Sequence, residues 1–148
     1  ARAAGAQHLL RYPDPALGAG IRSVAPDGVD RVVEVAMGVN AKLHTEVLRP
    51  RGTVATYGDD RGTGTVSLEF GPNLMLNARY QFVLLYTLPG DAKERAVEDV
   101  SGAVDVGAVR VGEEAGVPLH HYPLEATADA HRAVQDGAVG KVLVDVAD

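Results

Sequence analysis

The chain has 148 residues, of which 46% are hydrophobic and 23% are charged, and its formal net charge at pH 7 is −6. This length and composition predict one globular domain with one hydrophobic core, and they exclude a disordered or collagen-like chain. The 14 Lys and Arg residues form no long run, so nothing predicts a basic face, and nucleic acid is not an expected partner.

Cysteine is absent, which removes disulfides, thiolate nucleophiles and cysteine-based zinc sites together. The longest apolar run, at 82–86, is far shorter than the roughly 20 residues that span a bilayer, and no signal peptide opens the sequence. We therefore expect a cytoplasmic protein with no membrane partner. Residues 1–5 are typical of a last helical turn that Gly5 ends, so the sequence is expected to begin inside a helix.

The next elements are two short ones and a longer strand. Residues 8–12 are a strand candidate that the run Pro13-Asp14-Pro15 ends, because proline lacks the N–H that a ladder needs. Apolar residues at helical spacing predict a short helix over 16–24. Residues 29–36 carry a near-continuous apolar run, which favours a central strand covered by helices on both faces.

Helices and strands continue to alternate after this strand. The patterns predict a helix over 40–48, a buried strand over 53–57, an irregular glycine-rich stretch of 22 residues, and a third apolar strand over 80–86. A helix follows Pro89-Gly90-Asp91, and its expected inward residues are Ala92, Ala96, Val97, Val100 and Val104. The tail reads as a strand at 119–122, a helix at 125–135 and a strand at 141–146.

Strands that alternate with helices predict a parallel sheet, and ligands bind beyond the carboxyl ends of the strands in such sheets. Two of the buried strands end in glycine: VVEVAMG at Gly38 and GTVATYG at Gly58. A terminal glycine indicates a tight turn or the close approach of a ligand to the backbone. If the two strands are neighbours, their loops line a common rim.

The ordered set EVAMGVNAKLHTEVLRPRGTVATYG, FVLLY and YPLEATADAHRAVQDGAVGKVLVDV resembles the C-terminal half of zinc-independent quinone oxidoreductases of the medium-chain dehydrogenase/reductase superfamily, with zeta-crystallin the nearest type. The resemblance runs over nearly the whole chain. It implies an NADPH-dependent enzyme that transfers hydride to a small-molecule quinone or enone. In such an enzyme the cofactor carries the chemistry, and no residue of this chain is assigned a catalytic role.

The resemblance also implies which residues line the cofactor. These residues lie near the adenosine end of the cofactor, in the loop after GTVATYG beside its nicotinamide half, and on the strand that meets its carboxamide. They are Tyr12, Asn40, Tyr57, Gly58, Asp59, Asp60, Val83, Leu84 and Leu85. In the resembled family the strand over Tyr80 to Tyr86 also pairs with its copy across a two-fold axis, which predicts a homodimer. We expect that strand to serve both roles.

Two parts of such an enzyme have no counterpart in these residues: the N-terminal catalytic domain, and the first two strands with their glycine-rich turn. A dinucleotide fold holds the pyrophosphate at a glycine-rich turn between a first strand and a helix, and neither Gly18-Ala19-Gly20 nor Gly62-Thr63-Gly64 stands in that context. The expected fold is therefore α/β: a partial Rossmann-type parallel sheet with helices on both faces, lacking the first two strands and the Gly-rich loop, plus a C-terminal helix-strand segment. Residues 1–104 are the later part of a dinucleotide-binding domain, and residues 105–148 return to the catalytic domain in the resembled family.

Several residues have a second interpretation. Asn40 is a favoured N-cap for a helix that starts at Ala41, so it either caps the helix, contacts the cofactor, or does both. Asp59-Asp60 is also typical of a solvated turn. His120 and His121 point to opposite faces of a strand and cannot share a metal ion, and His44 and His131 stand on helices with no carboxylate at ligand spacing, so no metal site is expected.

Two other functions remain open for the chain as a whole. One is a non-catalytic dimerisation or binding module that keeps the fold and the dimer strand without the cofactor. The other is a different Rossmann-like enzyme such as a methyltransferase, whose strands also end in Gly-Asp, although its early glycine loop is missing too.

Overall fold

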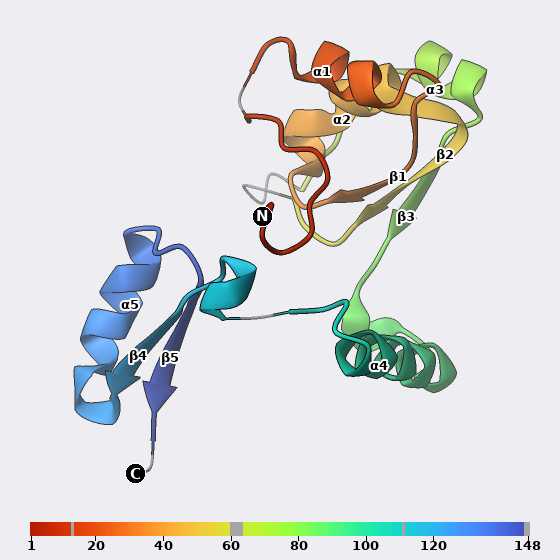
Figure 1. Cartoon of the computed structure of the whole chain (residues 1–148). Coiled ribbons are helices and arrows are strands. Elements are labelled where there is room, and N and C mark those ends of the chain that lie inside the picture. The colour runs from red at the N-terminus through yellow and green to blue at the C-terminus, as the bar shows by residue number, and fades with distance from the viewer. Residues whose placement is uncertain (13, 60–63, 111, 147–148) are drawn as a thin grey trace. The chain divides into compact units, whose positions relative to one another are not determined.

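A computed structural model describes residues 1–12, 14–59, 64–110 and 112–146. The chain divides into two compact units rather than the one expected from its length: Leu10–Gly90 forms one unit, and Ala1–Leu9 with Asp91–Asp148 forms the other. Figure 1 labels the elements of both units. The predicted α/β architecture with parallel strands is confirmed in each of them.

A three-stranded parallel sheet forms the centre of the unit Leu10–Gly90. Its strands are β1 (Val29–Glu34), β2 (Leu48–Thr56) and β3 (Arg79–Phe82), and their order is β1-β2-β3. The register places Val32 beside Val54, and Val54 beside Tyr80. The strand predicted to be central, β1, therefore lies at an edge of this sheet, and β2 occupies the centre.

Helices α1 (Leu17–Val24), α2 (Met37–Val47) and α3 (Phe70–Leu76) complete this unit (Figure 1). Helices α2 and α3 pack against β2, and α1 packs against α2. The sequence patterns missed α3 inside the expected irregular stretch, because Gly71 and Pro72 are typical of a loop. Both residues lie in the first turn, where proline loses no helical hydrogen bond. The left-handed Asn77, with φ of 47°, ends the helix.

The hydrophobic core of the unit lies between the sheet and the helices α2 and α3. Its fully buried members are Met37, Leu48 and Val54, and the partly buried residues that pack on them include Val32 and Tyr80. The alternate residue Val33 points to the other face of β1 and is 71% exposed. Among the described residues, that face of β1 is open to solvent.

Strand β2 begins five residues earlier than predicted, at Leu48 instead of Thr53. The pairing with β1 shifts register between Val29 and Arg31, and Arg51 adopts a left-handed φ of 65° within this stretch. A β-bulge of this kind hides a strand from pattern analysis, because the alternation of buried and exposed residues is interrupted.

Two predicted strands are wrong in whole or in part. Residues 8–12 form no strand. Strand β3 ends at Phe82 instead of Tyr86, although the Val83 N–H still donates to the Thr56 carbonyl at 2.8 Å. The chain then turns into the 3₁₀ helix η1 (Leu85–Thr87), which the Thr87 hydroxyl closes by donating to the Leu84 carbonyl.

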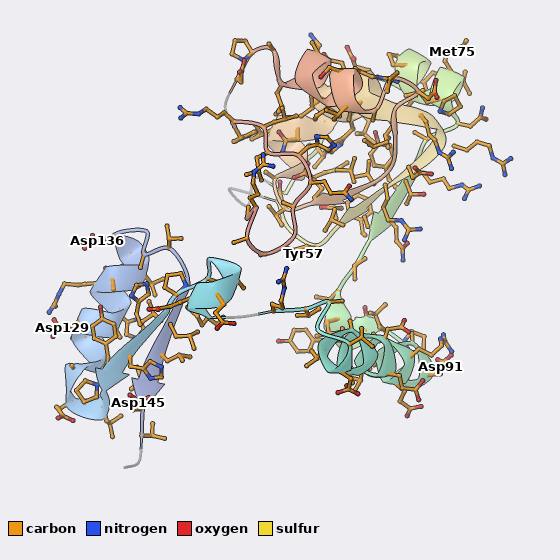
Figure 2. The ribbon with its side chains drawn as sticks, viewed as in Figure 1. Tyr57, Met75, Asp91, Asp129, Asp136 and Asp145 are labelled. Atoms are coloured by element: carbon orange, nitrogen blue, oxygen red, sulfur yellow. The ribbon has the colours of Figure 1, made fainter. Side chains whose placement is uncertain are left out.

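The second unit contains a two-stranded parallel sheet of β4 (Leu119–Pro123) and β5 (Lys141–Asp145). Helix α5 (Thr127–Gln135) packs on both strands, and the short 3₁₀ helices η2 (Glu113–Ala115) and η3 (Leu124–Ala126) precede β4 and α5. Figure 2 labels Asp129 on α5 and Asp145 on β5. Residues 1–5 form turns. Gly5 has a φ of 103°, and the next residue, Ala6, donates its N–H to the Ala1 carbonyl.

Helix α4 (Gly90–Asp105) forms where it was predicted, but its apolar stripe is not inward. Val97, Val100 and Val104 are 52–66% exposed, and no residue of the helix is buried. Helical periodicity identifies an apolar face without showing what covers it. None of the described helices is long and apolar enough to cross a membrane.

Candidate functional site

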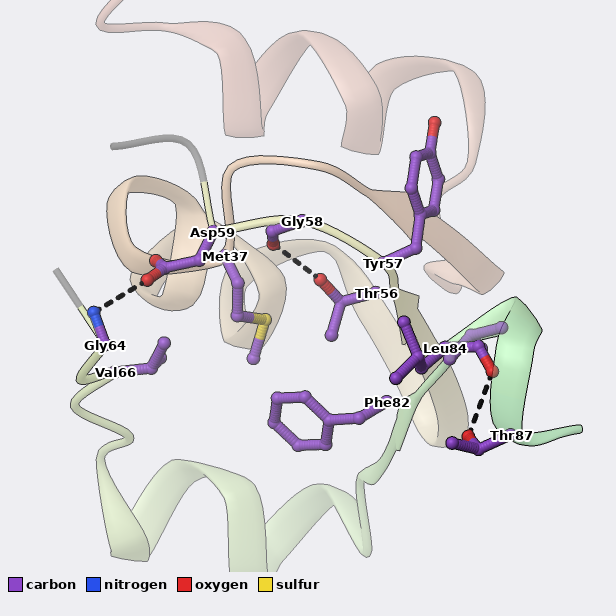
Figure 3. A pocket seen from close by; sticks show the side chains of 11 residues that line it. Met37, Thr56, Tyr57, Gly58, Asp59, Gly64, Val66, Phe82, Leu84 and Thr87 are labelled. Carbon is purple, nitrogen blue, oxygen red and sulfur yellow. Dashed lines mark hydrogen bonds between the residues drawn. The ribbon is translucent and has the colours of Figure 1, made fainter. Parts of the chain in front are cut away.

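The first cavity lies beyond the carboxyl ends of the parallel strands in the unit Leu10–Gly90, and its volume is about 470 Å³. Figure 3 shows its lining side chains. They come from the start of α2, from the loop after β2 and from the segment after β3, and they are Met37, Thr56, Tyr57, Gly58, Asp59, Gly64, Val66, Phe82, Val83, Leu84 and Thr87. This is the edge of the sheet at which the sequence patterns predicted a ligand to bind.

The loops after β1 and β2 meet at this cavity, as predicted for a common rim. An isolated antiparallel bridge joins Ala36 to Asp59. Met37 reaches the cavity from the first loop, while Tyr57, Gly58 and Asp59 reach it from the second. Parallel pairing explains the meeting, because it brings the ends of neighbouring strands to the same edge of the sheet.

Apolar side chains and backbone groups dominate the first cavity. Asp59 is the one carboxylate among its described lining residues, and its Oδ2 atom accepts a hydrogen bond from the Gly64 N–H at 3.0 Å. No Lys or Arg belongs to that described lining. Such a cavity suits an uncharged or cationic flat ring and is unsuited to a phosphate.

The structure gives a physical reason for the glycine at position 58. A Cβ atom added there would lie 2.8 Å from the carbonyl oxygen of Val35 on the neighbouring chain segment. The glycine is therefore required by the close approach of two loops of this chain. The Thr56 hydroxyl donates to the Gly58 carbonyl at 3.0 Å and holds the turn.

The side chain and the backbone of Tyr57 have different surroundings. Its side chain is 67% exposed, and Figure 3 shows the ring directed away from Met37 and Phe82. Its N–H donates to the Glu34 carbonyl at 3.3 Å. Met37 and Phe82 supply the apolar surface of the cavity.

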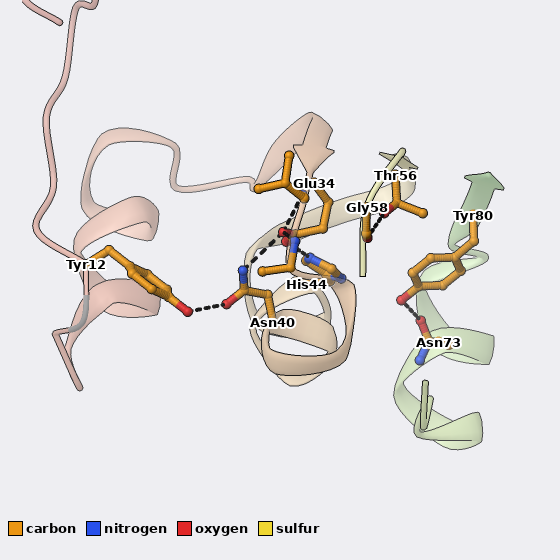
Figure 4. Close-up of polar contacts among 10 residues, drawn as sticks. Tyr12, Glu34, Asn40, His44, Thr56, Gly58, Asn73 and Tyr80 are labelled. Carbon is orange, nitrogen blue, oxygen red and sulfur yellow. Dashed lines mark hydrogen bonds and ion pairs between the residues drawn. The ribbon is translucent and has the colours of Figure 1, made fainter. Parts of the chain in front are cut away.

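The second cavity, of about 300 Å³, lies between the segment before α1 and helices α1 and α2. Two predicted site residues, Tyr12 and Asn40, line it, and the Tyr12 hydroxyl donates to Asn40 Oδ1 at 3.4 Å (Figure 4). The other lining residues are Asp14, Pro15, Leu17, Gly18, Val39, Leu43 and Glu46. Carboxylate and carbonyl acceptors therefore outnumber donors in its described lining.

Asn40 is not the N-cap of its helix. Helix α2 begins at Met37, and the residue before it, Ala36, forms no side-chain cap. Glu34 Oε1 instead accepts the N–H groups of Val35 at 2.8 Å and Ala36 at 2.6 Å. The same oxygen accepts Asn40 Nδ2 at 3.2 Å, which fixes the Asn40 carboxamide beside the second cavity.

Glu34 also forms a buried pair that the sequence did not reveal. His44 Nε2 donates to Glu34 Oε2 at 2.6 Å, and the two residues are 1% and 6% exposed. No carboxylate stands at ligand spacing from His44 in the sequence, and this partner lies ten residues away, on β1. Burial raises the pKa of Glu34, but the hydrogen bonds from Ala36, His44, Asn40 and Val35 outweigh it and hold the pKa below its usual value.

The far side of His44 meets Tyr80 of β3. The two ring centroids are 6.4 Å apart, and His44 Nδ1 has no hydrogen-bond partner within the described part of the chain. The Tyr80 hydroxyl donates to Asn73 Oδ1 at 2.6 Å, and burial raises the pKa of Tyr80. Polar groups of β1, α2, α3 and β3 thus line one interior layer (Figure 4).

Two predicted site residues remain, Leu85 and Asp60. Leu85 begins η1, is 62% exposed and does not line the first cavity. Asp60 lies outside the described residues. Patterns also missed six lining residues: Met37, Thr56, Gly64, Val66, Phe82 and Thr87. Thr56 and Phe82 are the last residues of β2 and β3, where the sheet rule places a site.

The histidines of the second unit fit packing and pairing roles. His120 Nε2 donates to the Val139 carbonyl at 2.8 Å, and His121 Nδ1 donates to Asp145 Oδ1 at 2.9 Å. The adjacent histidines therefore have separate partners, as expected for opposite strand faces. His131 lines a small hollow between α5 and β5 with Ala130, Val134, Val142 and Val144.

Residues 4–144 match a family model described as zinc-binding dehydrogenase. A search of curated proteins found no match. The donor set of this chain does not fit the metal in that description: cysteine is absent, and no group of three or more His, Asp or Glu side chains gathers among the described residues. No catalytic step is therefore derived through zinc.

Similar solved structures include an alcohol dehydrogenase, a quinone oxidoreductase and a protein solved with NADPH. Benzyl alcohol dehydrogenase from Acinetobacter calcoaceticus has a TM-score of 0.77 and 15% identity over 97% of this chain and 38% of its own. The quinone oxidoreductase of Pseudomonas syringae pv. Tomato DC3000 has a TM-score of 0.72 and 15% identity, over 98% of this chain and 44% of its own.

CurA from Vibrio vulnificus, solved in complex with NADPH, has a TM-score of 0.69 and 14% identity over 97% of this chain and 44% of its own. The chain thus spans about two fifths of the length of these solved proteins. At such identities the likeness shows the fold.

Proposed function

Because the chain belongs to the zinc-binding dehydrogenase family, we propose that it is part of an NADPH-dependent oxidoreductase that transfers hydride to a quinone or an enone. The observation that carries this proposal is the first cavity. It lies at the carboxyl ends of the strands, where α/β sheets bind cofactors, and five of the nine expected cofactor-binding residues line it. The likeness to the quinone oxidoreductase and to the NADPH complex of CurA supports the choice of substrate and cofactor.

The first cavity suits the nicotinamide half of the cofactor in size and chemistry. When bound, NADPH supplies the hydride, and the protein supplies orientation and electrostatics. Met37 and Phe82 offer apolar surface to a flat ring, and we assign the contact with the carboxamide to the backbone of the lining residues Gly58 and Leu84. Apolar walls also exclude water from the reacting ring.

In this proposal, each cavity binds one half of the cofactor. Tyr12 and Asn40 in the second cavity serve the adenosine half, whereas Tyr57, Gly58, Asp59, Val83 and Leu84 serve the nicotinamide half. Neither described lining contains a Lys or Arg side chain, so the phosphates lie outside both cavities. The glycine-rich turn that would hold them has no counterpart among the 148 residues.

The isolated chain is expected to be inactive, and to bind NADPH weakly or not at all. A fluorescence titration of the 148-residue chain with NADPH tests this directly. Binding weaker than micromolar supports the division of the site between this chain and other residues. Saturable micromolar binding would show that the chain holds the cofactor alone and would overturn it.

Residues 105–148 belong, in this proposal, with the catalytic domain of the intact enzyme, whereas 1–104 belong with the dinucleotide-binding domain. The enzyme is proposed to work without zinc in the cytoplasm.

A second function, as a dimerisation module, is favoured by the segment around the end of β3. This strand lies at the edge of its sheet, and Phe82, Leu84, Leu85 and Tyr86 are 56–88% exposed. An exposed apolar edge invites pairing with a second copy. Dimerisation is compatible with a cofactor site, whereas a module that only dimerises is the alternative to the oxidoreductase. In both cases the proposed homodimer forms through the segment from Tyr80 to Tyr86.

A further inference from the structure

Glu34 is not among the described lining residues of either cavity, yet its carboxylate holds the turn at which the first cavity begins. It is the last residue of β1 and is 6% exposed. Its Oε1 atom accepts the N–H groups of Val35 at 2.8 Å and Ala36 at 2.6 Å, together with Asn40 Nδ2 at 3.2 Å. A charged oxygen that accepts two consecutive backbone N–H groups fixes the turn between β1 and α2.

The turn that Glu34 holds also contacts the loop after β2. Ala36 forms an isolated antiparallel bridge with Asp59, and the Glu34 carbonyl accepts the Tyr57 N–H at 3.3 Å. Tyr57 and Asp59 both line the first cavity. The carboxylate therefore fixes a segment of backbone on which part of the cavity lining rests.

Two further contacts leave the turn little freedom to move without a change in the cavity. A Cβ atom added at Gly58 would lie 2.8 Å from the Val35 carbonyl oxygen, so the two segments are already at close approach. Met37 directly follows the turn, and it packs in the core with Leu48 and Val54 while it lines the cavity. A shift of the turn would therefore displace both an apolar wall of the cavity and the neighbouring loop.

We propose that Glu34 is a positioning residue, which sets the shape of the first cavity by fixing the backbone of Val35 and Ala36. This role rests on the function proposed above, because a ring held in the cavity must be aligned for hydride transfer. A carboxylate suits the task, since one oxygen accepts several N–H groups and an aliphatic side chain accepts none. The second oxygen, Oε2, accepts His44 Nε2 at 2.6 Å and anchors the carboxylate in the interior (Figure 4).

Glu34→Leu tests the proposal, because leucine is similar in size and accepts no hydrogen bond. The backbone amide signals of the ¹⁵N-labelled 148-residue chain are recorded without a ligand. We expect the signals of Tyr57, Gly58 and Asp59 to shift. The Ala36 amide should exchange with solvent roughly tenfold faster or more, as for the loss of one hydrogen bond to a charged group.

Two other variants separate positioning from a general structural role. Glu34→Gln keeps one oxygen for the N–H groups of the turn, and its amide nitrogen faces His44 Nε2, so the loop signals stay near their wild-type positions. His44→Phe removes the contact at Oε2 and leaves those at Oε1, so it destabilises the unit while the loop signals stay in place. A purely structural role predicts instead that both destabilising variants move the same signals.

If Glu34→Leu does not fold, a pH titration of the wild-type chain carries the test. The amides of the turn and of Gly58 should share one midpoint, that of the Glu34 carboxylate. The Gly64 N–H donates to Asp59 Oδ2 at 3.0 Å, so its signal reports on that second carboxylate. Because His44 is the titratable group that faces Glu34, the titration is repeated in His44→Phe. A Gly58 signal that follows Gly64 alone would overturn the proposal.

Unmoved loop signals in Glu34→Leu, or equal shifts in His44→Phe, would also overturn the proposal. NADPH is then titrated into both the wild-type chain and Glu34→Leu and followed at the Leu84 amide, where we expect roughly fivefold to tenfold weaker binding in the variant. If NADPH leaves the wild-type Leu84 signal unchanged, the assignment of the first cavity to the nicotinamide half fails. The signals recorded without a ligand still decide the role of Glu34 in that case.

Discussion

Replacing His44 by Phe tests how much the buried pair of β1 and α2 contributes to the stability of the unit Leu10–Gly90. The ring volume stays similar, but Glu34 Oε2 loses its donor at 2.6 Å. Both residues lie almost entirely out of solvent, so water cannot replace the donor. The carboxylate keeps its three donors at Oε1 and therefore stays ionised at neutral pH.

The expected cost follows from these contacts. A hydrogen bond to a charged group is worth about 1.5–3 kcal/mol, and breaking a buried ion pair costs about 3–5 kcal/mol when the remaining charge has no other partner. Because Glu34 retains the Oε1 contacts, we expect the free energy of unfolding to fall by about 2–3 kcal/mol. The orphaned His44 Nδ1 also disappears, which limits the loss.

Urea unfolding followed by tyrosine fluorescence measures this change, since Tyr12, Tyr57, Tyr80 and Tyr86 all lie in this unit. His131→Phe is the matched control, because His131 lies in the other unit. If His44→Phe unfolds at the wild-type urea concentration, the pair contributes nothing and the reasoning is refuted.

Three other changes have equally definite outcomes. Folding lowers the pKa of Glu34, so its ionised form stabilises the fold above its unfolded pKa of about 4.5, and this stability is lost as the pH falls through the lower folded value. Acid unfolding of Glu34→Gln should lack this loss. An acid-unfolding profile identical to that of the wild type would contradict the prediction. Gly58→Ala should destabilise the unit by about 1–3 kcal/mol in urea, because the new Cβ meets the Val35 oxygen, whereas Gly71→Ala meets no atom within 4 Å and should be neutral or stabilising. Leu85→Lys should convert a dimer to a monomer in light scattering, while Met75→Lys on exposed α3 should not; a monomeric wild-type chain would remove the dimer proposal.

Local patterns predicted strands and helices in both units. The apolar run of β1, the stripe of α2 and the tail elements β4, α5 and β5 all formed near their predicted positions. The boundaries failed where backbone geometry interrupts a pattern. The bulge near Arg51 hid the start of β2, and the proline in the first turn of α3 resembled a loop.

The site was predictable to the extent that it depends on topology. The rule for strand ends located the first cavity, because Gly58 and Met37 follow neighbouring parallel strands. The Glu34–His44 pair was not predictable, since its members lie ten residues apart on different elements and pair only after α2 packs on the sheet. Likewise, no local sequence pattern shows that Asn40 lies inside α2, or that the Glu34 carboxylate accepts the N–H groups just before this helix.

The most direct test of the proposed oxidoreductase site is a ¹H–¹⁵N NMR titration of the 148-residue chain with NADPH, carried to millimolar concentration. Gly58, Val83 and Leu84 line the first cavity, so their backbone amide signals report on its occupancy. We predict weak binding, with shifts concentrated on these amides and absent from the exposed helix α4. Shifts confined to other regions, or none at these three amides, would contradict the assignment of the first cavity to the nicotinamide half of the cofactor.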